Sequence, residues 1–331
     1  MKYRFKVACR SLLAGAGFCL LLPLPAMALN GKIPASRNRN GVYRGAAETA
    51  ADRNWAFHDT GDGAFELACG DRRLTFRQNR RTATFNGRLI HLNFQPFRDP
   101  SGRWFLHVRD IEQTADALLN APAPAVPLRR IILDPGHGGS DPGARGTELL
   151  EKNLNLHIAR LVADILRKRG FEVILTRSDD RFLALPERPR RITRHNADLF
   201  VSIHQNADPR KQGRGIETFV TTPAHCASSP GPERHTDDRP TPGNRFDRQS
   251  LQLAASVQNR LIEATGAVDR GVKRRRFAVV READCPAILV ECGFISTPAE
   301  HANMLDQAWR IKIATAIADG ISDCAGREPD K

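Results

Sequence analysis

Two histidines and two glutamates stand where predicted strands end or a predicted helix begins, and their types suit a metal site. His137 follows an apolar run and opens a glycine-rich loop, and His204 ends a second apolar run. Glu291 ends a third, and Glu151 lies in the first turn of a predicted helix. Two imidazoles and one carboxylate form the ligand set of many catalytic zinc sites, in which a fourth position remains for water. A second carboxylate beside such a site is suited to act as a general base.

Each of these residues also has a simpler interpretation. The loop around His137 could cradle a phosphate or merely end a strand, and His204 could be a hydrogen-bonded core histidine. Glu151 could serve only as an acid at a helix N-terminus, where the helix dipole favours it. Glu291 is harder to explain in this way, because an ionisable group at the end of an apolar strand is costly to bury without a partner. The four together favour a metal site, but the residues alone do not decide which carboxylate binds the metal.

The elements that position these residues alternate between strands and helices from residue 129 onward. Alternation of this kind predicts an α/β domain, a mainly parallel twisted sheet with helices on both faces. The carboxyl ends of parallel strands share one edge of the sheet, where ligand sites collect. The predicted strands are 131–133, 171–176, 199–203, 215–221, 277–280 and 287–291, and the longer predicted helices are 151–169, 248–265 and one ending near 321.

The N-terminus predicts export. Basic residues precede the apolar run 12–22, and Ala26-Met27-Ala28 supplies a cleavage signal, so residues 1–28 are interpreted as a signal peptide. The apolar run is too short for a membrane span, although a tethered anchor is the alternative. We therefore expect an exported protein of the periplasm or cell envelope, cut near Ala28, without a stable membrane span after signal cleavage.

Three further segments precede the α/β domain, which we place at 129–325. Residues 29–54 lack periodicity and predict a flexible lead-in. Residues 55–120 predict a small β-rich domain, because short alternating runs flank Asn86-Gly87, a strong hairpin signal. Residues 121–128 are rich in proline and alanine and predict an extended linker.

The net charge of the chain limits the classes of molecule that it is expected to bind. The net charge is +13, and the signal peptide contributes four positive charges and no negative ones, which leaves about +9. A basic exported protein is drawn to the anionic polymers and surfaces of the envelope. Nucleic acid is disfavoured as a partner by export and by the lack of aromatic residues among the basic ones. The run 273–276 is either a solvated basic face or a means of steering carboxylates.

The chain contains six short segments in a fixed order, at 132–146, 151–156, 175–177, 199–207, 269–273 and 290–296. In these segments and their order it resembles, over 129–322, the zinc-dependent N-acetylmuramoyl-L-alanine amidases with the type-3 catalytic domain. The resemblance implies Zn²⁺ held by His137, Glu151 and His204, with Glu291 as the catalytic carboxylate. Gln205 and Thr297 depart from the usual pattern but are not proposed ligands.

The resemblance implies hydrolysis of the amide bond between N-acetylmuramic acid and L-alanine in peptidoglycan, in wall remodelling, daughter-cell separation or recycling. It implies peptidoglycan as the substrate and an activator protein as a possible partner. Some relatives carry a helix that blocks the zinc, but five prolines in 223–243 disfavour one here. The region 55–120 resembles small β domains that precede catalytic modules in secreted wall enzymes. The alternatives are a zinc peptidase that cuts elsewhere in the stem peptide and a non-catalytic wall-binding protein with a structural zinc.

Overall fold

The described part of the chain begins within the predicted lead-in. Residues 41–54 form strand β2 (Gly41–Gly45) and helix α1 (Ala46–Asp52), with Tyr43 and Ala50 buried, so the expectation of a flexible lead-in is wrong there. The predicted signal peptide 1–28 and nearly all of the predicted linker lie outside the described residues. The computed structural model describes residues 35–38, 41–120, 128–229 and 239–325.

Most strands belong to one sheet of eleven, in the order β11-β10-β12-β15-β13-β14-β7-β6-β5-β4-β3. Five of its ten neighbouring pairs are parallel and five are antiparallel. The α/β class is confirmed, but the mainly parallel sheet is corrected to a mixed one. The strands are β3 Ala56–Asp59, β4 Ala64–Cys69, β5 Arg72–Arg77, β6 Thr82–Phe85, β7 Arg88–His91, β10 Arg130–Pro135, β11 Glu172–Leu175, β12 Leu199–Asn206, β13 Ile216–Val220, β14 Asp269–Arg274 and β15 Ala287–Phe294.

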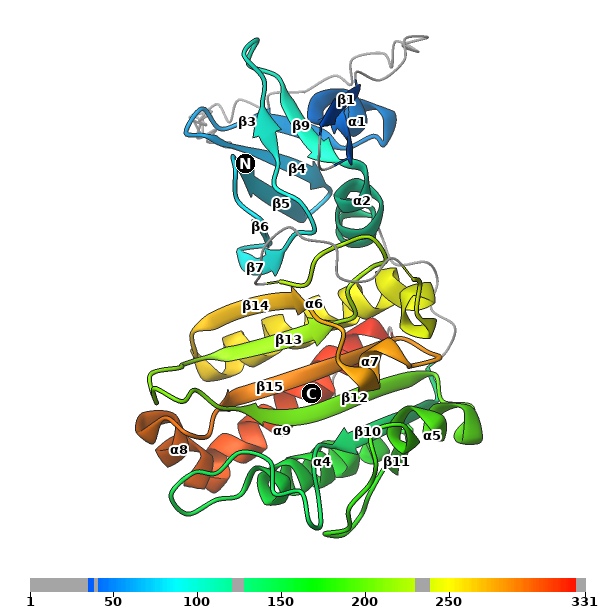
Figure 1. The fold of residues 1–331 in the computed structure, drawn as a ribbon, viewed down its shortest axis with the longest axis vertical. Helices are drawn as coiled ribbons and strands as arrows, with labels where there is room; N and C mark the ends of the chain where they lie inside the picture. Colours follow the sequence, from blue (N-terminus) through cyan, green and yellow to red (C-terminus); the bar gives the residue numbers. More distant parts are fainter. Residues whose placement is uncertain (1–34, 39–40, 121–127, 230–238, 326–331) are drawn as a thin grey trace, which may run out of the picture. The chain divides into compact units, whose positions relative to one another are not determined.

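The N-terminal strands follow the hairpin signals of their sequence. Strands β6 and β7 pair antiparallel around Asn86 and Gly87, whose φ angles of 47° and 82° suit the tight turn that this dipeptide favours. A second, four-stranded antiparallel sheet in the order β1-β2-β9-β8 lies in the same region (Figure 1). Its remaining strands are β1 Ala35–Asn38, β8 Phe97–Arg98 and β9 Trp104–His107.

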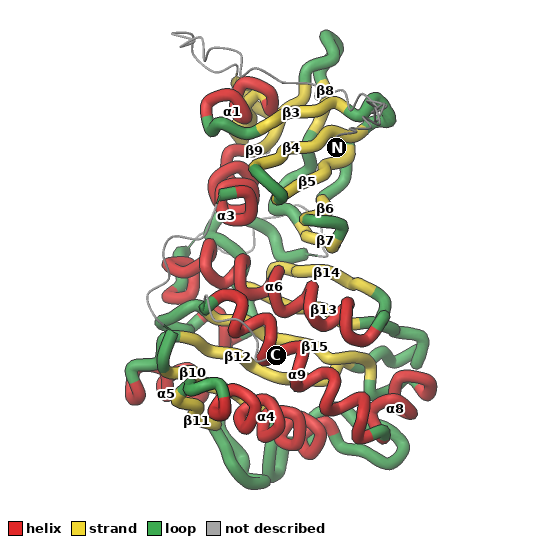
Figure 2. The backbone as a smooth tube through the Cα atoms, turned by 180° about the vertical axis from the view of Figure 1, so that it is seen from behind, coloured by secondary structure: helices red, strands yellow, loops and turns green. Residues whose placement is uncertain are grey.

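Helices cover both faces of the α/β part of the large sheet. Ile131 and Leu133 of β10 face one apolar core and Ile132 between them faces another, because successive side chains of a strand alternate. Helices α4, α6 and α9 cover the first face, which is nearest the viewer in Figure 2, and the short helix α7 lies on the second. The helices after α1 are α2 Val108–Asp110, α3 Asp116–Leu119, α4 Glu151–Lys168, α5 Glu187–His195, α6 Asp247–Thr265, α7 Ala278–Arg281, α8 Pro298–Leu305 and α9 Gln307–Cys324.

Helix α7 replaces a predicted strand over 277–280. Val279 and Val280 favour a strand by type, but a short apolar run does not distinguish a strand from a buried helical turn. Both side chains are buried in the core on the second face of the sheet. Among the described residues, no helix is long and apolar enough to cross a membrane.

The large sheet continues across the predicted boundary between the β-rich region and the α/β domain. Val272 of β14 pairs in parallel with Ile90 of β7, and Asp269 accepts a hydrogen bond from the backbone N–H of Leu89 at 2.9 Å. The described residues from 35 onward belong to one compact unit. A shared sheet does not show whether each part folds by itself, so the domain division at 121–128 stays a prediction.

Candidate metal centre

The loop that carries His137 is held by two buried arginines. His137 adopts a left-handed backbone conformation, with φ 60°, which is uncommon for a residue with a side chain. Arg188 donates to the carbonyl oxygen of His137 at 3.0 Å, and Arg177 donates to that of Gly136 at 2.9 Å. Gly138 has φ 133°, and a Cβ atom there would lie 2.3 Å from the carbonyl oxygen of Arg181. These contacts position the imidazole at the end of β10.

The structure brings the three predicted ligands together. His137 Nε2 lies 3.2 Å from Glu151 Oε2, and His204 Nδ1 lies 2.9 Å from Glu151 Oε1. One donor atom from each residue falls within 4.8 Å of the others. Glu151 is buried, whereas the histidine side chains are 26% and 17% exposed, so the cluster is accessible from one side.

Hydrogen bonds to neighbouring groups orient the cluster. Asp141 Oδ2 lies 2.7 Å from His137 Nδ1, which leaves Nε2 toward Glu151. Glu151 accepts from the backbone N–H groups of Ala144 at 2.8 Å and Gln205 at 3.1 Å. A carboxylate on the far nitrogen of a histidine is the usual support of a metal ligand. Asp141 was missed by the sequence reasoning, although its place four residues after His137 in the glycine-rich loop was a signal.

The electrostatics of the cluster favour a bound cation, either a proton on His137 or a metal ion in its place. Burial raises the pKa of the Glu151 carboxyl, but hydrogen bonds and charges from His137 and His204 outweigh it and hold that pKa well below its usual range. Burial lowers the pKa of His137, whereas Glu151 and Asp141 raise it, and the net direction is upward. An ionised carboxylate between two imidazoles attracts positive charge. Two nitrogen donors and one oxygen donor fit Zn²⁺.

Glu291 lies beside this cluster without belonging to it. On β15 it is the register partner of His204 on β12. Its Oε2 atom is buried and has no hydrogen-bond partner within the described ranges. Burial raises the pKa of Glu291 well above its ordinary value, and the charges of Glu151 and Glu217 add to the shift. An unpartnered carboxyl oxygen next to a possible metal site is the feature expected of an acid–base group.

Residues 131–323 match the family model described as N-acetylmuramoyl-L-alanine amidase, over more than half of the chain. The chain belongs to this family. It is 36% identical over 190 residues to the amidase LytC of Bacillus subtilis, a match that spans 57% of this chain but only 34% of LytC. It is 32% identical over 216 residues to the amidase AmiA of Escherichia coli, which covers 58% of this chain and 75% of AmiA.

Solved structures of family members resemble the α/β part. The amidase from Clostridium difficile 630 matches with a TM-score of 0.51 and 32% identity, over 60% of this chain and 96% of that one. AmiC2 of Nostoc punctiforme matches with the same TM-score and identity, over 60% and 98%. The order of the six sequence segments thus identified the family correctly.

A second buried charge cluster in this family member lies next to Glu291. Glu217 on β13 is the register partner of Glu291, and it is only 4% exposed. It accepts hydrogen bonds from Asn206 Nδ2 and Arg270 Nε, each at 2.7 Å, and from Lys273 Nζ. The sequence reasoning missed Glu217, although a single acid in the apolar strand was a signal.

The basic run 273–276 is not a uniformly solvated face. Lys273 is buried against Glu217, and Arg274 is buried with a hydrogen bond of 3.1 Å to Thr114 Oγ1. Arg275 and Arg276 are partly exposed. Strand alternation separates Lys273 from Arg274, the last residue of β14, and the next two arginines follow the strand, so the run is not one solvated patch.

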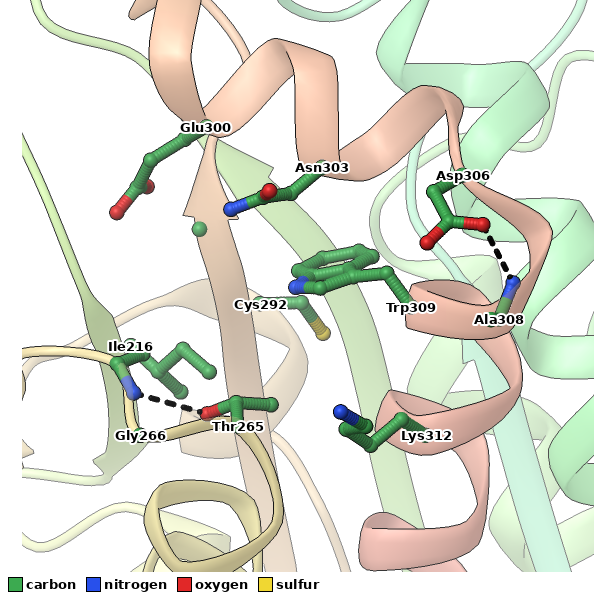
Figure 3. A pocket seen from close by; sticks show the side chains of 12 residues that line it. Ile216, Thr265, Gly266, Cys292, Glu300, Asn303, Asp306, Ala308, Trp309 and Lys312 are labelled. Atoms are coloured by element: carbon green, nitrogen blue, oxygen red, sulfur yellow. Dashed lines mark hydrogen bonds between the residues drawn. The ribbon is translucent and has the colours of Figure 1, made fainter.

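A separate cavity of about 400 Å³ adjoins β15 (Figure 3). Cys292, Trp309 and Lys312 are among its lining residues, and Asp306 caps α9 there by accepting from the N–H of Ala308 at 2.9 Å. None of the four predicted site residues lines it. Because Cys292 directly follows Glu291, alternation along the strand places the cavity and the carboxylate on opposite sides of the sheet.

Proposed function

We propose that this chain hydrolyses the amide bond between N-acetylmuramic acid and the L-alanine of the stem peptide in peptidoglycan, in remodelling of the wall, separation of daughter cells or recycling. The observation that carries the proposal is the cluster of donor atoms from His137, Glu151 and His204, within 4.8 Å of one another. It lies beside Glu291 in a chain that belongs to the amidase family.

The roles of the residues follow from their surroundings. His137, Glu151 and His204 would hold Zn²⁺, which supplies Lewis-acid chemistry by polarising a carbonyl group and making a water molecule more acidic. Asp141 keeps His137 in the tautomer that presents Nε2. Glu291 takes a proton from the attacking water and passes it to the leaving nitrogen as the C–N bond breaks. The products are a lactyl carboxylate and the free amine of L-alanine.

The arrangement favours a catalytic over a structural site. A structural zinc site usually has four protein ligands, whereas a catalytic site keeps an open position. In the described part of the chain, the group of ligand atoms contains three residues and not Glu291. Glu291 is therefore proposed as a base and not as a fourth ligand.

The cellular setting is also part of the proposal. We propose export by the signal peptide 1–28 and action in the periplasm or cell envelope, where peptidoglycan lies. The CwlD amidase of Clostridioides difficile, with a TM-score of 0.51 and 30% identity, was solved in complex with the GerS lipoprotein. A partner protein of that kind is the candidate activator here. In the proline-rich segment 223–243, the described residues form no α-helix.

The test is mass analysis of muropeptides released from purified sacculi by the mature protein, loaded with zinc or treated with a chelator. Free stem peptides and peptide-free glycan should appear only with zinc. Stem peptides cut internally would instead identify a peptidase. Binding to sacculi without release by either sample, also after addition of a candidate activator, would identify a wall-binding protein.

A further inference from the structure

We propose that Arg270 is a specificity residue that binds the free α-carboxylate of the second stem-peptide residue. The proposal rests on the proposed function. In peptidoglycan this residue is a glutamate linked through its γ-carboxyl group, so its α-carboxyl group is either free or amidated. Arg270 would therefore distinguish two natural forms of the substrate by charge.

The carboxylate of Glu217 is saturated by its neighbours and serves to orient Arg270. Its Oε1 accepts from Asn206, and its Oε2 accepts from Arg270 and Lys273. Glu217 and Lys273 are 4% and 5% exposed, so these groups are fixed in the protein interior. Two cations face one carboxylate, so this hydrogen-bonded group carries one net positive charge.

Of the two cations that contact Glu217, Arg270 is the one that is accessible to a ligand. Its side chain is 34% exposed, in contrast to Lys273. Its Nε is bound to Glu217 at 2.7 Å, its Nη1 donates to the carbonyl oxygen of Arg214 at 3.3 Å, and its guanidinium lies 4.8 Å from the ring centroid of Phe294. These three contacts order the guanidinium before a ligand binds, so little conformational entropy is lost on binding. Its remaining N–H groups point in a fixed direction, which suits hydrogen bonding to a carboxylate.

The position of Arg270 matches the length of the substrate. Strands β15, β13 and β14 are consecutive in the sheet (Figure 1), so the backbone of Arg270 is two strand spacings, or about 10 Å, from that of Glu291. Its side chain extends back toward Glu217 on β13. An extended chain advances about 3.5 Å per residue, so the α-carboxylate lies about 7 Å from the scissile bond. A stem peptide that crosses the strands from Glu291 toward β14 would bring this group to Arg270.

The experiment compares two synthetic N-acetylmuramoyl peptides that differ only in a free or amidated α-carboxyl group on the second residue. The variants are Arg270→Gln and Arg270→Lys, and Arg190→Gln, which changes an exposed arginine of α5, is the control. For the unsubstituted enzyme and the control, kcat/KM should be about tenfold or more higher with the free carboxylate, mainly through KM. Arg270→Gln should remove this preference by lowering kcat/KM for the free carboxylate more than for the amidated substrate. Arg270→Lys should keep part of the preference for the free carboxylate, because lysine retains the positive charge but lacks the paired N–H groups of a guanidinium.

The outcomes separate this inference from the proposed function. Equal kcat/KM of the unsubstituted enzyme for both substrates would overturn the carboxylate site, and so would an equal loss on both in Arg270→Gln. Such an equal loss is what a purely structural role predicts, and thermal melting of each variant would show it independently. If the unsubstituted enzyme cleaves neither peptide nor sacculi, the proposed function itself fails.

Discussion

Removal of Arg188 should weaken both the fold and the metal centre. Its Nη1 lies 2.9 Å from Asp134 Oδ1, and the two side chains are 4% and 0% exposed. The same guanidinium donates to the carbonyl oxygens of Pro135, His137 and Leu183, at 3.0 to 3.2 Å. Among the described residues, Arg188→Met would leave the buried carboxylate of Asp134 with hydrogen bonds from the hydroxyls of Thr176 and Ser202 and with the more distant charge of Arg177.

The expected loss follows from the removal of the direct ion-pair partner of Asp134. Breaking a buried ion pair on one side costs about 3–5 kcal/mol. Arg188→Met combined with Asp134→Asn leaves no carboxylate at this position, so its loss should fall to about 1–3 kcal/mol from the missing hydrogen bonds. Urea denaturation of the zinc-free proteins measures the free energies of unfolding. Because His137 loses a donor to its carbonyl group in both variants, zinc affinity should fall about tenfold or more in both.

Two results would refute this reasoning. If the double variant is as unstable as Arg188→Met, the charge of Asp134 is not the cause of the loss. If zinc affinity by chelator competition is unchanged in both variants, Arg188 does not position the loop of His137. The exposed-site variant Arg190→Gln, from the same helix, should change neither measurement.

Three other predictions concern the site and its surroundings. Glu291→Gln should retain zinc by metal analysis and lose about 10²-fold or more in turnover, whereas His204→Ala should lose both; an active Glu291→Gln enzyme would remove the assigned base. Burial and the charge of Lys273 lower the pKa of His91 from 6.5 to about 4, so stability should be lost as pH falls from 6.5 toward 4, by about 3 kcal/mol at most. His91→Gln should flatten this dependence in melting curves, and an unchanged slope would contradict it. Gly138→Ala should cost roughly 1–3 kcal/mol and weaken zinc binding, since its Cβ would meet a backbone oxygen; unaltered melting and affinity would show that the loop can relax.

Local pattern was enough to predict several features of this protein. The Asn86-Gly87 hairpin and the long helix from Glu151 depend on neighbouring residues, and both occur as expected. The proximity of His137 and His204 was also predictable, because His137 follows β10 and His204 lies near the end of β12, and the carboxyl ends of these parallel strands share an edge. Their roles as ligands stay a prediction until a metal is measured.

Strand direction in the large sheet was not predictable in this way. Strand β13 is apolar enough to be buried on both faces, and such a run has the same pattern whether its neighbour is parallel or antiparallel. Its antiparallel pairing with β15 places Glu217 beside Glu291. The other four antiparallel pairs lie among β3 to β7, and the sheet is mixed because β7 joins these strands to β14.

The sequence by itself determined which residues carry reactive groups and on which local element each one lies, because motifs and periodicity act over a few neighbouring positions. Only the tertiary structure decided what surrounds those groups. Arg188 meets the carbonyl of His137 from 51 positions away, and Arg270 meets Glu217 from 53. Contacts at such separations depend on how strands and helices pack, and no local pattern encodes that packing.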